Sequence, residues 1–586
     1  MSSTQTLLLG PYANDVQAAI RRLETEQVAK RLQEKDATLW SRDRAVQETI
    51  AQRLGWLDAP FVMAQRISVL RQLAEDARTA RLAWALLLGM GGSGLFAEVC
   101  RTMFGVPVDG LDLSVLDTTD SAAIRSSERR GRLEQLLVVV SGKSGSTSEI
   151  SALSKYFYHS LSSTAAVNGR AGAHCIAVTD AGTSLEQQAK AWHFRSIFTH
   201  GNGTGAEVGG RFSALTYFGL VPAALMGIDV GRLLECAQQT LQFSIGQFGQ
   251  SPSADKNPPL QLGAVLAALA LAGRDKLTLL CSAPLAGFGG WLEQLVAEST
   301  GKLGRGIIPV FGEPLLEPTA YGTDRVFIEM QLSGRRDEAL KRRVQGLVDV
   351  GHPIVTIHWG DLYDLGTEVI RWSIATAVAC CLLEINPFDE PNVKESKERT
   401  KSLLERYVKE GTFPVLGEEV FSGPEAVVSA TAAAARRALS LSQCLAEFLQ
   451  LRKPYDYFGV LSFLPRSDAL DGIVYALRER LVRELGHAAL IGFGPRYLHS
   501  TGQLFKGGPD TGLFLELTAD EQDDLEIPGE SFTFGVLKQA QALGDFQAMH
   551  EHDRRVLHIH LRGHLEESAK QLLASLDEAI VRITRR

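Results

Sequence analysis

Two series of apolar runs, each alternating with helical segments, constrain the fold of this chain more than any other feature. The first series occupies residues 83–88, 113–116, 136–140, 175–179 and 195–198. The second occupies residues 277–280, 307–310, 326–330 and 354–357, and it ends in a helical segment at 365–383. Strands that alternate with helices form parallel sheets that helices cover on both faces. The pattern therefore predicts an α/β fold with two tandem, doubly wound, parallel-sheet domains.

The remaining segments complete a prediction of four parts. Residues 1–60 are charged and helical in period, so they are predicted to form an N-terminal helical segment. The two α/β domains are placed at 61–255 and 256–424, with a helical stretch at 214–272 between their strands. Residues 425–586 are predicted to form a separate C-terminal domain.

The C-terminal domain shows a different order of elements. Strands are predicted at 457–463, 488–493, 513–517 and 555–561, and helices at 468–485 and 534–542. The Ala-rich segment 426–446 and the segment 566–582 are also predicted to be helical. The order βαββαβ is typical of a split βαβ arrangement, which makes this domain α+β.

The composition excludes several classes of protein. With 45% hydrophobic and 22% charged residues, this chain of 586 residues is neither disordered nor stapled by disulfides. The net charge of −8 leaves no global positive field, which argues against nucleic acid as a partner. The seven cysteines include no CxxC pair, which is typical of reduced, buried thiols in a cytoplasmic protein. No weakly polar stretch is expected to reach the roughly 18–20 residues that span a bilayer, so we expect neither secretion nor a membrane partner.

A glycine-rich loop follows the first strand of the first series. Gly89-Met90-Gly91-Gly92-Ser93-Gly94 precedes a predicted helix, so its backbone N–H groups and the helix N-terminus would hold an anion. We predict that Gly91, Gly92 and Ser93 bind phosphate. The loop also satisfies GxGxxG, with Asp117 ending the next strand, which leaves a nicotinamide dinucleotide as an alternative ligand. A turn that only permits close packing of helix and strand is the other alternative.

A second polar loop follows residues 136–140. It contains Ser141, Gly142, Lys143, Ser144, Ser146 and Thr147. Hydroxyl donors, loop N–H groups and an ammonium at the C-terminal end of a parallel strand favour a phosphate monoester as ligand. A Walker A loop would need glycine at Leu137, so the pattern disfavours a nucleoside triphosphatase. The alternative is a solvated, serine-rich turn.

The two loops resemble the paired phosphate-binding turns of sugar isomerase (SIS) domains, and three further segments resemble phosphoglucose isomerases. These segments are Val-Gly-Gly-Arg-Phe-Ser at 208–213, Gln-Leu-Val-Ala-Glu-Ser-Thr-Gly-Lys at 294–302, and Ile-Asn-Pro-Phe-Asp at 385–389 followed by Lys397. The motifs occur in the family's order across roughly 80–400. The whole chain further resembles the isomerase half of bacterial transaldolase–phosphoglucose isomerase fusions, without the transaldolase half. The resemblance implies two SIS domains and interconversion of glucose 6-phosphate and fructose 6-phosphate, in glycolysis and gluconeogenesis, without cofactor or metal.

The resemblance also implies a role for each matching residue. Glu298 matches the base that moves a proton between C2 and C1, and its pKa should be raised by partial burial. Arg211, after Gly210, matches the cation that faces the enediolate, and Lys397 matches the lysine near the ring oxygen. Gln294 lies one helical turn before Glu298 and should share its face. The alternatives are a helix-surface glutamate, a surface salt bridge and a solvated helix face.

The sequence departs from the family pattern at two places. Glu390 stands where the family has glutamine, and a carboxylate there would repel phosphate. We therefore expect Glu390 to turn away, to be neutral, or to pair with a cation such as Lys143. The family's ring-opening histidine is also absent, because the nearest segment, 322–327, contains none.

His499 is the predicted substitute for that histidine. The polar, glycine-containing segment 496–508 is interpreted as a flexible, substrate-facing loop, with an exposed loop histidine as the alternative. His352 and His358 are the next candidates. His558 and His560 alternate on a strand without metal-ligand spacing, so they are interpreted as residues of the sheet surface.

Three rival functions remain open at this level. They are a non-catalytic sugar-phosphate sensor, a dual phosphoglucose and phosphomannose isomerase, and a nicotinamide-dependent dehydrogenase. The expected partner is a small-molecule sugar phosphate. In the family a neighbouring subunit completes the active site, which implies a homodimer, whereas a histidine supplied by the same chain would remove that need.

Overall fold

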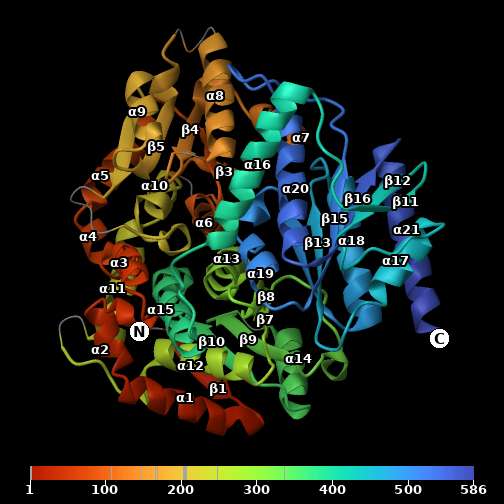
Figure 1. The fold of residues 1–586 in the computed structure, drawn as a ribbon. Helices are drawn as coiled ribbons and strands as arrows, with labels where there is room; N and C mark the ends of the chain where they lie inside the picture. Colours follow the sequence, from red (N-terminus) through yellow and green to blue (C-terminus); the bar gives the residue numbers. More distant parts are fainter. Residues whose placement is uncertain are drawn as a thin grey trace.

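The structure, a computed structural model, describes residues 3–106, 109–145, 147–164, 167, 169–201, 207–246, 249–335 and 337–585. In these residues the strands form three sheets. Figure 1 shows the first sheet in the upper part of the molecule, the second at the bottom and the third on the right. The α/β class predicted from the sequence is confirmed.

The first sheet has the strand order β3-β2-β4-β5-β6, and its strands are parallel. They are β2 (Trp84–Gly89), β3 (Asp112–Leu116), β4 (Leu136–Ser141), β5 (Cys175–Asp180) and β6 (Ser196–His200). The helices between them are α6 (Leu95–Phe104), α7 (Ser121–Glu128), α8 (Ser148–Ser163) and α9 (Ser184–Ala191). β2 and β4 are buried along their whole length, which is why they read as continuous apolar runs.

The second sheet has the order β1-β10-β9-β7-β8. Its parallel strands are β7 (Lys276–Cys281), β8 (Ile308–Val310), β9 (Arg325–Leu332) and β10 (Ile354–Trp359). The predicted helical stretch before them contains α10 (Tyr217–Leu225), α11 (Val230–Ile245) and α12 (Pro258–Leu271). α13 (Phe288–Thr300), α14 (Glu338–Asp349) and α15 (Leu365–Leu383) follow within the domain.

The segment Leu362–Leu383 is apolar and long enough to cross a membrane by length and composition, with a mean hydropathy of 1.3. The sequence-based expectation that no stretch has this length is therefore wrong. The apolar window of this segment is 100% buried inside the protein, and α15 packs against α11 and α12. The segment is thus a core helix of the fold.

The N-terminal segment contains one strand that the sequence pattern did not predict. β1 (Thr4–Leu8) adds an antiparallel edge to the second sheet, with Thr4 opposite His358 and Leu8 opposite Ile354. The expectation of a wholly helical segment is wrong here, because five residues that alternate between exposed and half-buried are too short to show a clear pattern. The helices α1 (Ala13–Thr25), α2 (Val28–Gln33) and α3 (Arg44–Gln52) follow as predicted, and α4 (Ala59–Ala64) and α5 (Ile67–Thr79) continue the helical region beyond residue 60. The proposed domain boundaries near 60, 255 and 424 stay predictions.

The third sheet has the order β11-β12-β16-β15-β13-β14. β13 (Tyr457–Ser462), β14 (Ala488–Phe493), β15 (Gly512–Ala519) and β16 (Arg555–Leu561) are parallel, and β11 (Glu418–Ser422) and β12 (Ala426–Ala430) form an antiparallel edge. The split βαβ pairing predicted for this domain is therefore wrong. The connection after β14 holds two short helical elements, η13 (Arg496–His499) and α19 (Gly502–Gly507), and it is long enough for a parallel crossover.

The helix predicted at 426–446 is also wrong in its first part. Residues Ala426–Ala430 alternate between buried and half-buried and pair with β16, so they form β12. The helix α17 (Leu441–Leu449) begins only after a turn, and its N-cap Ser440 accepts a hydrogen bond from the Gln443 N–H. The β-branched residues Val427 and Val428 favour a strand, although alanine does not.

Two long helices lie side by side in the centre of the molecule (Figure 1). They are α16 (Pro391–Glu410) and α20 (Phe534–Glu551). α20 also contacts α19, and side chains of α16, α20 and the first sheet share one apolar cluster. α18 (Asp468–Leu485) and α21 (Leu565–Thr584) complete the C-terminal domain. The centre is thus built by the first sheet together with helices that follow the strands of the second and third sheets, and the candidate site lies there.

Candidate active site

Most of the site residues predicted from the sequence line one cavity of about 450 Å³. Its lining includes Gly91, Gly92, Ser93, Ser141, Gly142, Lys143, Ser144, Thr147, Gly210, Arg211, Gln294, Glu298, Lys397 and His499. Ser146, also predicted to bind phosphate, lies outside the described residues. The cavity further contacts Arg53, Glu207 and Glu390. The two predicted loops and the three motifs therefore meet at one place.

The glycine loop packs closely against two parts of the chain that are distant in sequence. A Cβ at Gly92 would lie 1.9 Å from the Gly210 carbonyl oxygen, and one at Gly91 would lie 2.6 Å from the His499 carbonyl oxygen. Gly91 also has a φ of +52°, a conformation that favours glycine. The glycines are therefore needed to bring the Arg211 and His499 segments against the loop.

The second loop connects the end of β4 to α8. Lys143 forms an ion pair with Asp180 at the end of β5, and not with Glu390 as one sequence-based expectation allowed. Burial raises the pKa of Asp180, and Lys143 opposes that effect. The Oγ atom of Ser141 is buried without a hydrogen-bond partner in the described part of the chain. Such a hydroxyl is available to a ligand.

Arg211 is held rigidly in η8 (Gly210–Phe212) and is only 1% exposed. Nε donates to Ser299 Oγ at 2.9 Å, and Nη2 donates to the carbonyl oxygens of Pro387 at 2.5 Å and Asp389 at 2.9 Å. Nη1 lies 3.5 Å from Oε1 of Glu298. The surface salt bridge considered from the sequence is therefore wrong.

Glu298 lies on α13 and is 6% exposed. Gln294, one turn earlier, donates from Nε2 to Oε2 of Glu298 at 3.0 Å and to the His499 carbonyl oxygen at 2.8 Å. Burial raises the pKa of Glu298, Arg211 opposes this effect, and the like charge of Glu390 adds to it. The raised pKa agrees with the sequence-based expectation, and the helix-surface alternative is wrong. Oε1 of Gln294 has no hydrogen-bond partner among the described residues.

His499 reaches the cavity from the C-terminal domain. Its Nε2 lies 2.8 Å from Oε1 of Glu149, which also accepts a hydrogen bond from Gln541 Nε2 at 2.7 Å. Burial alone would raise the pKa of Glu149, but His499 and Lys397 outweigh that effect and lower it to about 2. The carboxylate therefore stays ionised and fixes the imidazole. Sequence reasoning missed Glu149 and Gln541, although Glu149 ends the second loop.

The segment around His499 differs from its predicted form. The sequence indicates a flexible loop, but η13 and α19 order the segment, and Tyr497, Leu498 and most of α19 are buried. The polar side chains are misleading because they find buried partners: Tyr497 Oη donates to Asp545 Oδ2 at 2.7 Å, and Lys506 pairs with Asp545. His352 and His358, the next candidates, do not line the cavity.

Lys397 and Glu390 come from the same stretch of chain. Lys397 lies on the exposed face of α16 at the rim of the cavity, so the solvated-face alternative describes its exposure correctly. Glu390, just before α16, accepts a hydrogen bond from Arg211 Nη1 at 3.1 Å and lies 3.6 Å from Arg53 Nη1. Of the expectations for Glu390, pairing with a cation is the one observed, with different cations from the one named.

The histidines of β16 are not plain surface residues. His558 is buried beside Glu516, at 3.2 Å, and burial lowers its pKa to about 4. The surface interpretation is wrong for His558 because α20 covers that face, with Phe546 at 5.3 Å between ring centroids. Within the described ranges, no group of three or more His, Cys, Asp or Glu is arranged to hold a metal ion.

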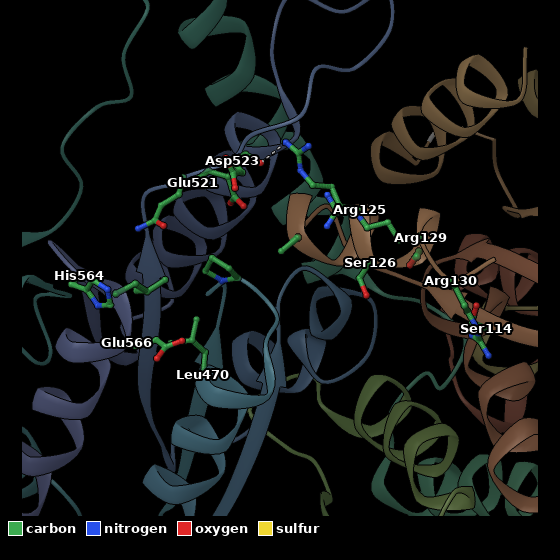
Figure 2. A pocket seen from close by; sticks show the side chains of 15 residues that line it. Ser114, Arg125, Ser126, Arg129, Arg130, Leu470, Glu521, Asp523, His564 and Glu566 are labelled. Atoms are coloured by element: carbon green, nitrogen blue, oxygen red, sulfur yellow. Dashed lines mark hydrogen bonds between the residues drawn. The ribbon is translucent and has the colours of Figure 1, made fainter. Parts of the chain in front are cut away.

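A larger cavity, of about 1060 Å³, lies between α7 and the C-terminal domain. Figure 2 shows Arg125 and Arg129 on one side, Glu521 and Asp523 facing them, and His564 farther away. Arg125 donates to the Asp523 carbonyl oxygen at 3.0 Å. This cavity contains none of the motif residues, so size alone does not identify the candidate site.

The chain is similar to known proteins both in sequence and in fold. No family model matches the chain. A glucose-6-phosphate isomerase of Acholeplasma laidlawii (strain PG-8A) is 27% identical over 393 residues, which are 60% of this chain and 90% of the relative. One of Synechococcus sp. (strain JA-3-3Ab) is 26% identical over 372 residues, 56% of this chain and 66% of the relative. The chain is a homologue of the glucose-6-phosphate isomerases. The similarity supports an aldose–ketose isomerase, as predicted.

Solved structures show the same fold. A hypothetical protein from Thermus thermophilus matches with a TM-score of 0.57 and 21% identity, over 68% of this chain and 100% of that chain. A glucose-6-phosphate isomerase from Chlamydia trachomatis D/UW-3/Cx matches with a TM-score of 0.54 and 17% identity, over 70% and 90%. The predicted pair of sugar isomerase domains is confirmed at the level of fold.

Proposed function

We propose that this protein interconverts glucose 6-phosphate and fructose 6-phosphate through a cis-enediolate, a step of glycolysis and gluconeogenesis. The observation that carries the proposal is the contact between Glu298 and Arg211, 3.5 Å apart, in the cavity that both phosphate-loop candidates line. A carboxylate base beside a fixed guanidinium is what proton transfer through an anionic intermediate needs. The homology to glucose-6-phosphate isomerases supports the same reaction.

The phosphate of the substrate binds at the ends of β2 and β4. Ser93, Ser141, Ser144 and Thr147 offer hydroxyl donors there, and the helices α6 and α8 begin directly after the loops. Their N-terminal N–H groups favour an anion. The ammonium of Lys143 adds positive charge, partly compensated by Asp180.

Glu298 is the base that moves the proton between C2 and C1 of the open-chain sugar. Its raised pKa makes it a stronger base than an exposed glutamate, and Gln294 orients its second oxygen. Arg211 stabilises the charge that grows on the enediolate oxygens. Because the guanidinium is already held by Ser299, Pro387 and Asp389, it needs little reorganisation when that charge develops.

His499 opens the sugar ring, with Lys397 close to the ring oxygen. The imidazole of His499 transfers a proton at the ring oxygen, and the ionised carboxylate of Glu149 holds the imidazole in place. In this proposal, the C-terminal domain of the same chain supplies the ring-opening histidine. In the family, that histidine lies between the glutamate and lysine motifs.

The rival functions have less support. A sugar-phosphate sensor would need the loops but no base beside Arg211. A dinucleotide would use Asp117, but Arg496 lies 3.3 Å from that carboxylate. Activity on mannose 6-phosphate stays an alternative for the same site. We further propose a cytoplasmic location, a sugar phosphate as ligand, and no nucleic-acid or membrane partner; a homodimer is not required to complete this cavity.

A coupled assay tests the proposal directly. Purified protein, treated with chelator and given no cofactor, is incubated with fructose 6-phosphate, and formation of glucose 6-phosphate is followed. Turnover that Glu298→Gln abolishes supports the proposal. Absence of turnover by the wild-type protein, or equal turnover by the variant, contradicts it.

A further inference from the structure

A second carboxylate shares Arg211 with Glu298. Nη1 of Arg211 lies 3.1 Å from Oε2 of Glu390 and 3.5 Å from Oε1 of Glu298. Because Nε and Nη2 are committed to Ser299 and to backbone carbonyl oxygens, the guanidinium cannot turn toward either carboxylate alone. The two glutamates are therefore coupled through one nitrogen atom.

The N-terminal segment supplies the charge that balances the second carboxylate. Arg53, directly after α3, places Nη1 3.6 Å from Oε1 of Glu390. With Glu298 and Glu390 both ionised, two carboxylates face two guanidinium groups, so this group of four is electrically neutral. Without Arg53 it would carry one excess negative charge in the cavity that is proposed to bind phosphate.

The position of Arg53 is fixed by two contacts between its own segment and the segment that carries Arg211. Leu54 forms an antiparallel bridge with Val208, three residues before Arg211. Trp56 stacks on Phe212 with ring centroids 5.4 Å apart. The end of α3 is thus attached to the segment that carries Arg211, and Arg53 is only 27% exposed at its side chain.

We propose that Glu390 and Arg53 are positioning residues that set the basicity of Glu298 in opposite directions. The inference rests on the proposed isomerase function, and it assigns a task to the N-terminal segment. Glu390 places a negative charge near Glu298 and shares the positive charge of Arg211 with it. Both effects disfavour ionisation of Glu298. Arg53 neutralises Glu390, so it limits that effect.

The other charges around Glu298 do not explain this opposition. Lys302, after α13, lowers the pKa of Glu298, but it also pairs with Asp389 at 2.8 Å. Lys143, Lys397 and His499 line the same cavity. All of these groups are unchanged in the variants below, so a difference between the variants reports Glu390 and Arg53.

Two variants separate the effects by their sign. Glu390→Gln keeps an acceptor for Arg211 but removes the like charge, so the acidic limb of the kcat/KM profile should move to lower pH by about 0.5–1 unit. Arg53→Gln leaves Glu390 uncompensated, so the same limb should move to higher pH. Arg44→Gln on α3 and Glu405→Gln on α16 are matched controls, with side chains 92% and 60% exposed, and should move nothing.

A readout without turnover keeps this inference separate from the proposed function. The full-length protein is labelled with ¹³C at the glutamate carboxyl carbons, and its NMR spectrum is followed as the pH is varied. The signal that is missing in Glu298→Gln belongs to Glu298. Opposite displacements of that titration in Glu390→Gln and Arg53→Gln support the inference even in a protein that fails the isomerase assay. Displacements of equal sign, or none, overturn it, including the case in which both variants merely lose kcat.

Discussion

Nε2 of His499 lies 2.8 Å from Oε1 of Glu149, although 350 residues separate them in the chain. Glu149 belongs to the first turn of α8, and His499 belongs to the crossover after β14. The C-terminal domain therefore contributes His499 to a cavity whose other lining residues include the loops after β2 and β4. The same Glu149 oxygen accepts a hydrogen bond from Gln541 of α20, so the contact has support from a second element of that domain.

His499→Asn should impair turnover of the cyclic sugar phosphate, because ring opening needs a proton moved at the ring oxygen. It should impair much less the exchange of the C1/C2 proton on an open-chain substrate, since that step uses Glu298 and Arg211. Coupled kinetics and proton exchange measured by NMR give the two rates. His358→Asn, outside the cavity, is the control. An equal loss in both rates would assign His499 a purely structural role.

Glu149 should make the stability of the protein depend on acid pH. Its pKa is about 2 in the folded protein against an ordinary value of 4.5, so its contribution is full above pH 4.5 and is lost as the pH falls through about 2. Glu149→Gln should therefore flatten the fall in the free energy of unfolding over this range. Urea unfolding at a series of pH values measures it, with Glu405→Gln as the control. An unchanged slope would contradict the assigned pKa.

Glu298→Gln should lower kcat by about 10³-fold or more and change KM little, because the amide keeps the shape but cannot accept the proton. Steady-state kinetics with fructose 6-phosphate measure both constants. Glu293→Gln is a matched control on the same helix, since burial raises the pKa of Glu293 to about 7 but the residue lies outside the cavity. Retention of more than a tenth of wild-type turnover would remove Glu298 as the base.

Ser93→Ala combined with Ser144→Ala should raise KM for the phosphorylated sugar by roughly 100-fold or more and alter kcat much less. Each hydroxyl that bonds a charged oxygen contributes about 1.5–3 kcal/mol, and the bond is made in ground and transition states alike. Ser126→Ala with Ser127→Ala, in the larger cavity, is the matched control. An unchanged KM would exclude the two loops from the phosphate site.

The parts of the fold that the sequence predicts are those with strong local patterns. β2 and β4 are buried on both faces and so appear as unbroken apolar runs, and α15 is buried around its whole circumference and is mostly apolar. β1 and β12 escape prediction because each is five residues long and pairs with a strand distant in the sequence, β10 or β16. Strands this short carry too few residues to outweigh helical composition nearby.

The same distinction applies to the site. Glu298 and Arg211 lie in continuous motifs, so their types and spacing identify them. Arg53 lines the cavity and Gln541 contacts Glu149 beside it through packing between elements far apart in sequence, such as the Leu54–Val208 bridge, and no local pattern marks either residue. The segment 496–508 is mispredicted for the opposite reason: its polar residues indicate a loop, whereas Asp545 satisfies them in the interior.

Asp545 should be essential for holding the His499 segment in place. Its carboxylate pairs with Lys506 and accepts from Tyr497, and the side chains of Lys506 and Asp545 are both 0% exposed. Asp545→Asn leaves the Lys506 charge buried without a counter-ion, which should cost about 3–5 kcal/mol in the free energy of unfolding. Lys506→Met combined with Asp545→Asn removes that charge and should recover much of the loss, because Asn still accepts from Tyr497. Urea unfolding of both variants measures the difference. A double variant no more stable than Asp545→Asn would show that the buried charge is not what the carboxylate compensates.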